Sequence, residues 1–320
     1  MGFLLRVSVL IYIFLPLVAR AHIKWFVEVS PPTLLHYSFL EWQVWIGILL
    51  IICVLIAARI LETKSSLTRK AKKKITAWEP LLTSIAQAII GIALIIFSLQ
   101  SFVFAPNFHT EQIYLLTIQA FVGLSFIFGF YTRIGGILLL ILYVLASLSF
   151  GWIPLLDACE FLGVGIFTFI AGRPRLSFIH SASLDVITKS LRPYALPFLR
   201  IFLGLNLLIL AFTEKLLHPD LGVLFLQTNT WNFMNGLGVS VFTDYWFVFA
   251  AGICEALFGM LLISGFITRT TTILLSIFLI ATLILLGPLE LVGHLPHFAV
   301  ALLLITIGSG TRLKIRIRRH

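Results

Sequence analysis

The chain has 320 residues, of which 60% are hydrophobic and only 11% are charged, and its formal net charge is +10. Soluble globular domains carry about 25% charged residues, and the mean hydropathy here is +1.07. These values exclude a soluble globule, a disordered chain and a disulfide scaffold, and they indicate a polytopic membrane protein. Whether the positive charge suggests a nucleic-acid partner depends on where the basic residues fall.

Residues 1–21 have the pattern of a secretory signal peptide. Arg6 supplies the positive start, residues 7–18 form a short apolar segment, and Ala19-Arg20-Ala21 fits the small-x-small cleavage rule. An apolar run of about 12 residues is short for a membrane span. We therefore expect cleavage, with an uncleaved short anchor as the alternative, and either outcome places His22 on the outer side.

Nine later stretches are long and apolar enough to predict membrane-spanning helices. They lie near residues 43–61, 80–100, 112–131, 134–150, 155–172, 196–214, 244–266, 270–287 and 290–308. The connectors between them are short and polar or contain Gly and Pro. The predicted fold class is therefore an all-α polytopic membrane protein with about nine mature transmembrane helices.

The positions of Lys and Arg predict the orientation. Most of them fall in the same set of alternate connectors, including Lys70–Lys74, Arg173–Arg175 and the tail 313–320. The positive-inside rule places these segments in the cytoplasm, with the mature N-terminus outside, in a bacterial inner membrane. Topology and contact with anionic lipid explain the basic runs, so we expect the lipid bilayer as a partner and no nucleic acid.

The sequence also repeats itself. Gly123–Arg133 reads GLSFIFGFYTR and Gly259–Arg269 reads GMLLISGFITR, with Gly, Gly, Phe, Thr and Arg at the same spacing. The preceding helices align through Gly91 and Gly204. Because each unit enters and leaves from the cytoplasmic side, the units are parallel rather than inverted.

The repeat predicts one extra N-terminal helix followed by two parallel four-helix units. The expected segments are the outer N-terminal stretch, first span and basic loop in 22–79, a first unit in 80–175, a cytoplasmic linker in 176–195, a second unit in 196–312 and a basic tail in 313–320.

The second unit resembles the DoxX/DoxD-like family of small four-helix membrane proteins. The matching residues are Arg200, Gly204, Lys215, Glu255, Gly265, Thr268, Arg269, His294 and His297. The resemblance covers about 196–312 well and 80–175 weakly. It implies membrane redox chemistry, as in the membrane subunit of thiosulfate:quinone oxidoreductase, although many members of the family have no assigned activity.

The first unit lacks the ionisable residues of the second. At the aligned positions, Gln87 replaces Arg200, Phe102 replaces Lys215 and Gln119 replaces Glu255. The structural Gly and Thr-Arg positions are present in both units. We therefore expect any chemistry to lie in the second unit.

Ionisable residues at membrane depth cost about 2.5–3.5 kcal/mol on insertion scales, and they are usually functional or paired. Glu255 and His297 lie about 15–16 Å from the inner ends of their predicted helices, and His294 is one turn further out. The long side chain of Arg200 is expected to reach toward Glu255. At the outer ends we note Glu214, Lys215 and His218.

We interpret these residues as an outward-opening polar pocket. Glu255, His297 and His294 are candidate catalytic proton carriers, and the candidate substrate-binding residues are Arg200, Lys215, Glu214 and His218. The alternative is a buried Arg–Glu pair with hydrogen-bonded histidines that only hold the bundle together.

Three isolated cysteines, Cys53, Cys159 and Cys254, indicate neither a redox dithiol nor a thiolate metal site, and we expect no metal centre. The chain shows no haem, flavin or iron–sulfur ligand set of its own. The leading hypothesis is the membrane subunit of a quinone-linked oxidoreductase that works with a redox partner protein. The alternative is a non-catalytic membrane transporter or assembly factor for a small anion, lipid or metal.

Overall fold

The computed structural model describes residues 35–64, 69–172, 186–229, 231–287, 289–310 and 312–315. The predicted signal peptide and His22 lie outside these ranges, as does much of the predicted linker. The elements are α3 (Trp42–Lys64), α4 (Arg69–Leu99), α5 (Ile113–Phe128), α6 (Thr132–Phe150), α7 (Trp152–Leu155), η1 (Leu156–Ala158), α8 (Glu160–Ala171), η2 (Lys189–Tyr194), α10 (Ala195–Ala211), η3 (Phe212–Leu216), α11 (Pro219–Asn229), α12 (Phe233–Gly236), α13 (Asp244–Ser264), α14 (Thr268–Leu286) and α15 (Leu289–Thr306). The all-α polytopic architecture is confirmed.

Each of the nine predicted stretches forms a helix, but the helices differ in length. Among the described residues, five are long and apolar enough to cross a membrane: Trp42–Glu62, Ala77–Leu99, Thr132–Phe150, Val186–Leu216 and Asp244–Ser264. A sixth candidate is broken, since Trp152–Ala158 and Glu160–Ala171 meet at 64°. Three are shorter apolar helices: Ile113–Phe128, Thr268–Ile284 and Leu291–Thr306.

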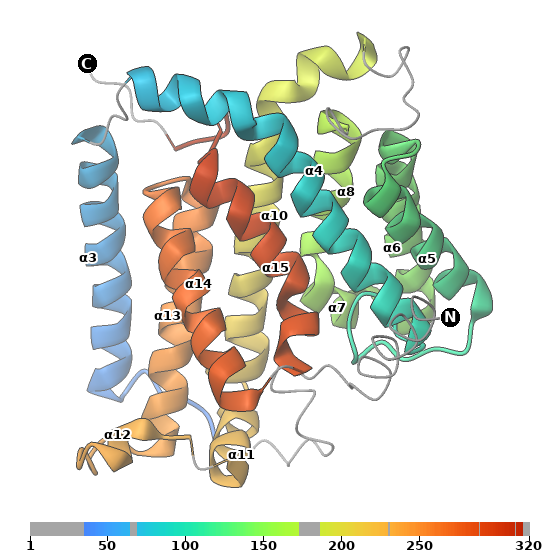
Figure 1. Cartoon of the computed structure of the whole chain (residues 1–320). Helices are drawn as coiled ribbons and strands as arrows, with labels where there is room; N and C mark the ends of the chain where they lie inside the picture. Colours follow the sequence, from blue (N-terminus) through green and yellow to red (C-terminus); the bar gives the residue numbers. More distant parts are fainter. Residues whose placement is uncertain are drawn as a thin grey trace, which may run out of the picture.

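The eight helices of the two units form a closed circuit of contacts (Figure 1). The order is α4, α5, α6, α8, α10, α13, α14 and α15, and α15 packs back on α4. The fourth helix of each unit therefore packs on the first helix of the other unit. Helix–helix interfaces therefore join the two units.

Aligned glycines make the same close contact in both units. A Cβ added to Gly91 would lie 2.6 Å from the carbonyl oxygen of Gly123, and one added to Gly204 would lie 2.7 Å from that of Gly259. Helices approach this closely in a membrane only where small residues face each other. The first two helices of each unit therefore cross at equivalent points, α4 on α5 and α10 on α13.

Replacing Gly204 by alanine should lower the free energy of unfolding in mild detergent by about 1–3 kcal/mol, because the new methyl group forces α10 away from α13. Gly236→Ala is the matched control, since a Cβ there meets nothing within 4 Å. Equal stability of the two variants would show that the close crossing contributes little.

The same turn also closes the second helix of each unit. Gly129 and Gly265 end α5 and α13 with φ of 72° and 78°, and two residues later Tyr131 and Ile267 have φ of 45° and 35°. Glycine adopts the left-handed conformation without steric cost, which explains the glycine in the repeated turn.

The extra helix α3 lies against the second unit, beside α13 (Figure 1). Gly47 faces the ring of Phe249, and Ala58 packs among Leu257, Leu261 and Phe266. Much of the rest of α3 is exposed and apolar, which suits contact with lipid.

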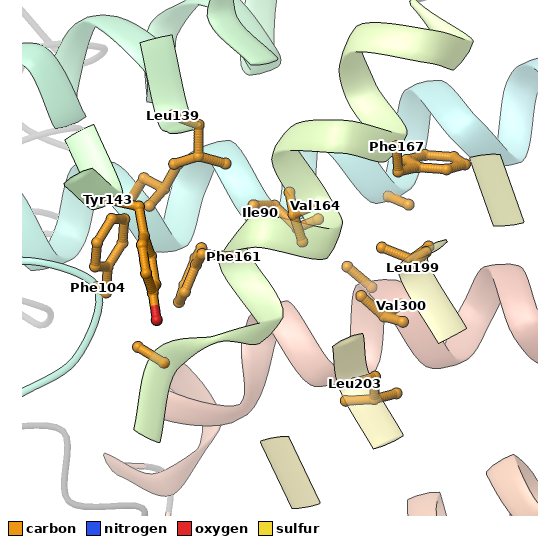
Figure 2. Packing of buried hydrophobic residues seen from close by; sticks show 14 of the residues in the cluster. Ile90, Phe104, Leu139, Tyr143, Phe161, Val164, Phe167, Leu199, Leu203 and Val300 are labelled. Atoms are coloured by element: carbon orange, nitrogen blue, oxygen red, sulfur yellow. The ribbon is translucent and has the colours of Figure 1, made fainter. Parts of the chain in front are cut away.

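One apolar core runs through both units. Phe104 and Phe161 stack at a ring distance of 4.8 Å, and Val164 continues the cluster toward Leu199 and Val300 of the second unit (Figure 2). Because this core crosses the boundary, polar groups buried near it need partners from within the protein.

Candidate functional site

An ion pair joins two of the predicted site residues, Lys215 and Glu255. Lys215 Nζ donates to Glu255 Oε2 at 2.7 Å, and the two side chains are only 17% and 20% exposed. Glu255 lies near the middle of α13, ten residues before Gly265 and therefore about 15 Å from that end of the helix. The pair connects α13 to the turn at the end of α10.

That turn is a π-helical turn, η3, which takes one more residue per turn than an α-helix. Such turns occur often at functional sites, because the extra residue redirects the side chains after it. Gly252 makes room for it: a Cβ there would lie 2.8 Å from Leu216 Cδ2 and 3.1 Å from Lys215 Cβ. The backbone of Lys215 therefore packs against α13 at Gly252, which lies about one helical turn before Glu255.

The face of α13 that carries Glu255 points into the second unit. Glu255 precedes Phe258 by three residues and Leu262 by seven, so all three share one side of the helix. Phe258 and Leu262 belong to the main core cluster. The residues that pack on α3, such as Ile253 and Leu257, lie on a different face.

Glu214 and His218 flank Lys215 but differ in exposure. Glu214 is 1% exposed and precedes Lys215 within η3, whereas His218 is exposed on the connection to α11. Of these two predicted substrate-binding residues, therefore, one is buried inside the second unit and the other lies at its surface.

His294 and His297 lie side by side on α15. Their rings are 5.7 Å apart at 81°, and both residues are buried. Val292, which packs on α4, lies about 140–160° around the helix from them. Since α15 also packs on α14 and α10, the imidazoles face the interior of the second unit.

Arg200 does not take the place that the sequence suggested. Its Nη1 donates to the carbonyl oxygens of Leu262 and Ile263, and its Nη2 donates to that of Leu313 at 2.8 Å. The carbonyls of Leu262 and Ile263 lie at the end of α13 remote from Glu255, about 10 Å further along the helix axis. Leu313 belongs to the C-terminal segment. The prediction that Arg200 reaches toward Glu255 is therefore wrong, and the partner of Glu255 is Lys215.

Three arginines share this role of closing a helix end. Arg133 donates to Phe169 and Ile170 carbonyls at the end of α8, and Arg269 donates to those of Ile305, Thr306 and Ile307 at the end of α15. Each guanidinium lies against a glycine with positive φ, as Arg200 does against Gly265. Positive charge at a helix C-terminus satisfies its free carbonyls and interacts favourably with the helix dipole.

We call this side of the molecule the arginine end, defined by Arg133, Arg200 and Arg269. Glu62 also lies there, accepting a hydrogen bond from Ile267 N at 2.9 Å and an ion pair from Lys314 Nζ at 2.8 Å. At the opposite end, Tyr37 donates to the carbonyl of Tyr245 at 2.9 Å. Burial raises the pKa of the Tyr37 phenol, and the nearby Tyr245 and carboxylates raise it further.

In the first unit, the residues aligned with Lys215 and Glu255 also contact each other, through an uncharged hydrogen bond. Gln119, aligned with Glu255, donates from Nε2 to the carbonyl of Phe102 at 2.9 Å, and Phe102 is aligned with Lys215. Its Oε1 accepts from the backbone N–H of Phe104 at 2.8 Å. The amide thus satisfies backbone groups at the position where the second unit holds an ion pair.

Three polar residues outside the predicted site lie near the contact of α10 with η1 and α8. Asp157, Glu160 and Asn206 are all buried at this contact. The carboxyl group at the start of an apolar helix was the available signal, but nothing in the sequence showed that Asn206 bonds to the backbone carbonyl of Asp157 just before that helix.

No group of three or more His, Cys, Asp or Glu side chains that suits a metal ion occurs in the described ranges. Cys53, Cys159 and Cys254 are free thiols.

Residues 195–288 match the model of the DoxX family. The match covers α10, α13 and α14, and with them Arg200, Lys215 and Glu255. It ends before His294 and His297 and does not extend into the first unit. No curated protein and no solved structure matches the chain.

Proposed function

We propose that this multi-pass protein, with a DoxX match in its second unit, is the membrane subunit of a quinone-linked oxidoreductase. The observation that supports this most strongly is the Lys215–Glu255 pair within apolar helices. A buried ion pair is rarely a net gain in stability over apolar side chains of similar size. A function at this site accounts for its presence.

The residues present suit a quinone as substrate. A quinone ring is flat and apolar apart from two carbonyl oxygens, and its reduction takes two electrons and two protons. The ammonium group of Lys215 is a hydrogen-bond donor for one oxygen, and the carboxyl group of Glu255 binds and releases protons. Apolar helices around the pair would receive the ring directly from the lipid.

His294 and His297 would pass protons between the Glu255 region and water, because an imidazole ring has one nitrogen that accepts a proton and one that donates it. Arg200 is assigned to the fold and not to substrate, since its guanidinium is occupied by backbone carbonyls. Glu214 and His218 remain candidates for the approach to Lys215. A partner protein would exchange the electrons.

The test compares quinone binding by the wild type, Lys215→Met and Glu255→Gln after purification into lipid nanodiscs. Lys314→Met is the matched control, because it breaks a similar ion pair with Glu62 at the arginine end. In the two site variants only, we expect the amount of co-purified quinone and the affinity for added ubiquinone or menaquinone to fall about tenfold or more. A tenfold change in affinity corresponds to about 1.4 kcal/mol, which is what one hydrogen bond contributes.

Unchanged binding in well-folded Lys215→Met and Glu255→Gln would refute the proposal. Uptake of a small anion by vesicles that contain the wild type, with no bound quinone, would instead favour the transporter hypothesis.

A further inference from the structure

The second buried polar cluster lies at the crossing of α8 and α10, where the two units meet. The span that contains α8 is broken here, since α7 and η1 meet α8 at 64°. Asp157 is 8% exposed, Glu160 is 6% exposed and Asn206 is fully buried. Broken helices at membrane depth are tolerated where protein covers them, and in membrane proteins their ends commonly coordinate ions.

Two buried oxygens at this crossing have no hydrogen-bond partner in the part of the chain that the structure describes. Asn206 donates from Nδ2 to the backbone carbonyl of Asp157 at 2.8 Å, which leaves its amide oxygen Oδ1 without a donor. Glu160 Oε2 is likewise buried without a donor. Two buried acceptors without a donor indicate that the site lacks a hydrogen-bond donor or a cation.

Among the described residues, the titratable neighbours of Glu160 supply no cation. Asp157 acts on it with a like charge, and Cys159 and Tyr143 are the other titratable neighbours. The Tyr143 hydroxyl already donates to the carbonyl of Leu155 at 2.8 Å. The first turn of α8 favours a negative charge by up to about 2 kcal/mol, which is less than the several kcal/mol that burying a carboxylate costs.

We propose that the crossing of α8 and α10 binds one monovalent cation: a proton on Glu160, or a sodium ion held by oxygens of Glu160, Asp157 and Asn206. Either would neutralise the buried carboxylate. The proton would turn Glu160 into a hydrogen-bond donor, whereas the sodium ion would be a positive partner for the buried oxygens. This site lies apart from Lys215 and Glu255, requires no quinone and goes beyond the proposed function.

The π-turn η3 connects the two sites. Thr213 Oγ1 contacts Asp157 Oδ1 at 3.5 Å, and Lys215, two residues later in the same turn, contacts Glu255. A cation that changes the position of Asp157 therefore acts on the turn that carries Lys215.

The experiment uses the full chain in nanodiscs and takes two measurements. Infrared difference spectra between high and low pH detect a protonated carboxylic acid. Thermal unfolding in sodium chloride or choline chloride at equal ionic strength detects sodium binding. The variants are Glu160→Gln and Asn206→Leu, and the control is Glu111→Gln, whose side chain is exposed at the start of α5.

A proton site predicts a carboxylic-acid band that Glu160→Gln abolishes and that Asn206→Leu and Glu111→Gln retain. A sodium site predicts a higher unfolding midpoint in sodium for the wild type and Glu111→Gln, and none for Glu160→Gln or Asn206→Leu. We expect Glu160→Gln to fold, because an amide supplies the missing donor.

A wild-type protein that shows neither the band nor the sodium effect overturns the proposal, whether or not the variants fold. An infrared band or a sodium effect that persists in Glu160→Gln overturns it as well. Quinone binding is read separately, so failure here leaves the proposed function untouched, and the reverse also holds.

Discussion

Replacing Glu255 by alanine is expected to lower the free energy of unfolding by about 2–3 kcal/mol, because Lys215 is left charged without its partner. Removing one member of a fully buried ion pair costs about 3–5 kcal/mol. We expect less here, since about one fifth of each side chain is exposed. Unfolding by denaturant in mild detergent measures the difference, with Glu111→Ala as the exposed control.

The double variant Lys215→Met/Glu255→Leu should recover most of that loss. Both charges are then absent, and two apolar side chains fill the space between η3 and α13. A double-mutant cycle isolates the pair. If Glu255→Ala is as stable as the wild type, the two side chains do not form a buried pair in the membrane. A double variant that is stable yet binds no quinone would show that the pair serves function more than folding.

Replacing Arg200 by methionine is expected to cost about 3–4 kcal/mol of stability, the largest loss among single arginine variants. The guanidinium satisfies carbonyls at the end of α13 and holds Leu313 of the C-terminal segment. Hydrogen bonds from a charged donor contribute about 1.5–3 kcal/mol each, and the buried acceptors left behind add to the loss.

Arg312→Met is the control for this prediction, because Arg312 is an exposed arginine beside the same segment. Arg200→Lys should recover only part of the loss, since an ammonium group cannot reach several carbonyls with fixed geometry. Equal stability of Arg200→Met and Arg312→Met would contradict the assignment of Arg200 to the fold, and would return it to the candidates for substrate binding.

Arg200 also shows that the depth of a side chain in the membrane does not by itself identify its partner. Its position along α10 and its length made contact with Glu255 plausible, but the end of α13 offered free carbonyls much nearer. The last carbonyls of a helix lack partners within the helix, and a fork-shaped donor satisfies several at once. The repeated Thr-Arg turn carried this information, since Arg133 and Arg269 make the same kind of contact.

Lys215 was predicted as a substrate-binding residue, yet its pairing with Glu255 was not. In an uninterrupted α-helix, the position of a residue in the sequence determines the direction in which its side chain points around the helix axis. The π-turn η3 adds a residue to the turn and rotates the later side chains by about 100° around the helix axis. A deviation of this kind depends on the space that Gly252 leaves on α13, which is a tertiary contact.

The sequence by itself determined the elements that depend on local chemistry. Apolar runs determined the helices, glycine and arginine determined their ends, and repeated spacing predicted two units. Only the tertiary structure decided how these elements meet: α3 on the second unit, α15 on α4, and α10 on η1 and α8, where Asn206 bonds to Asp157. The physical reason is that composition, charge and periodicity describe each helix alone. The choice of neighbour depends on the fit of one helix surface to another across the whole membrane domain.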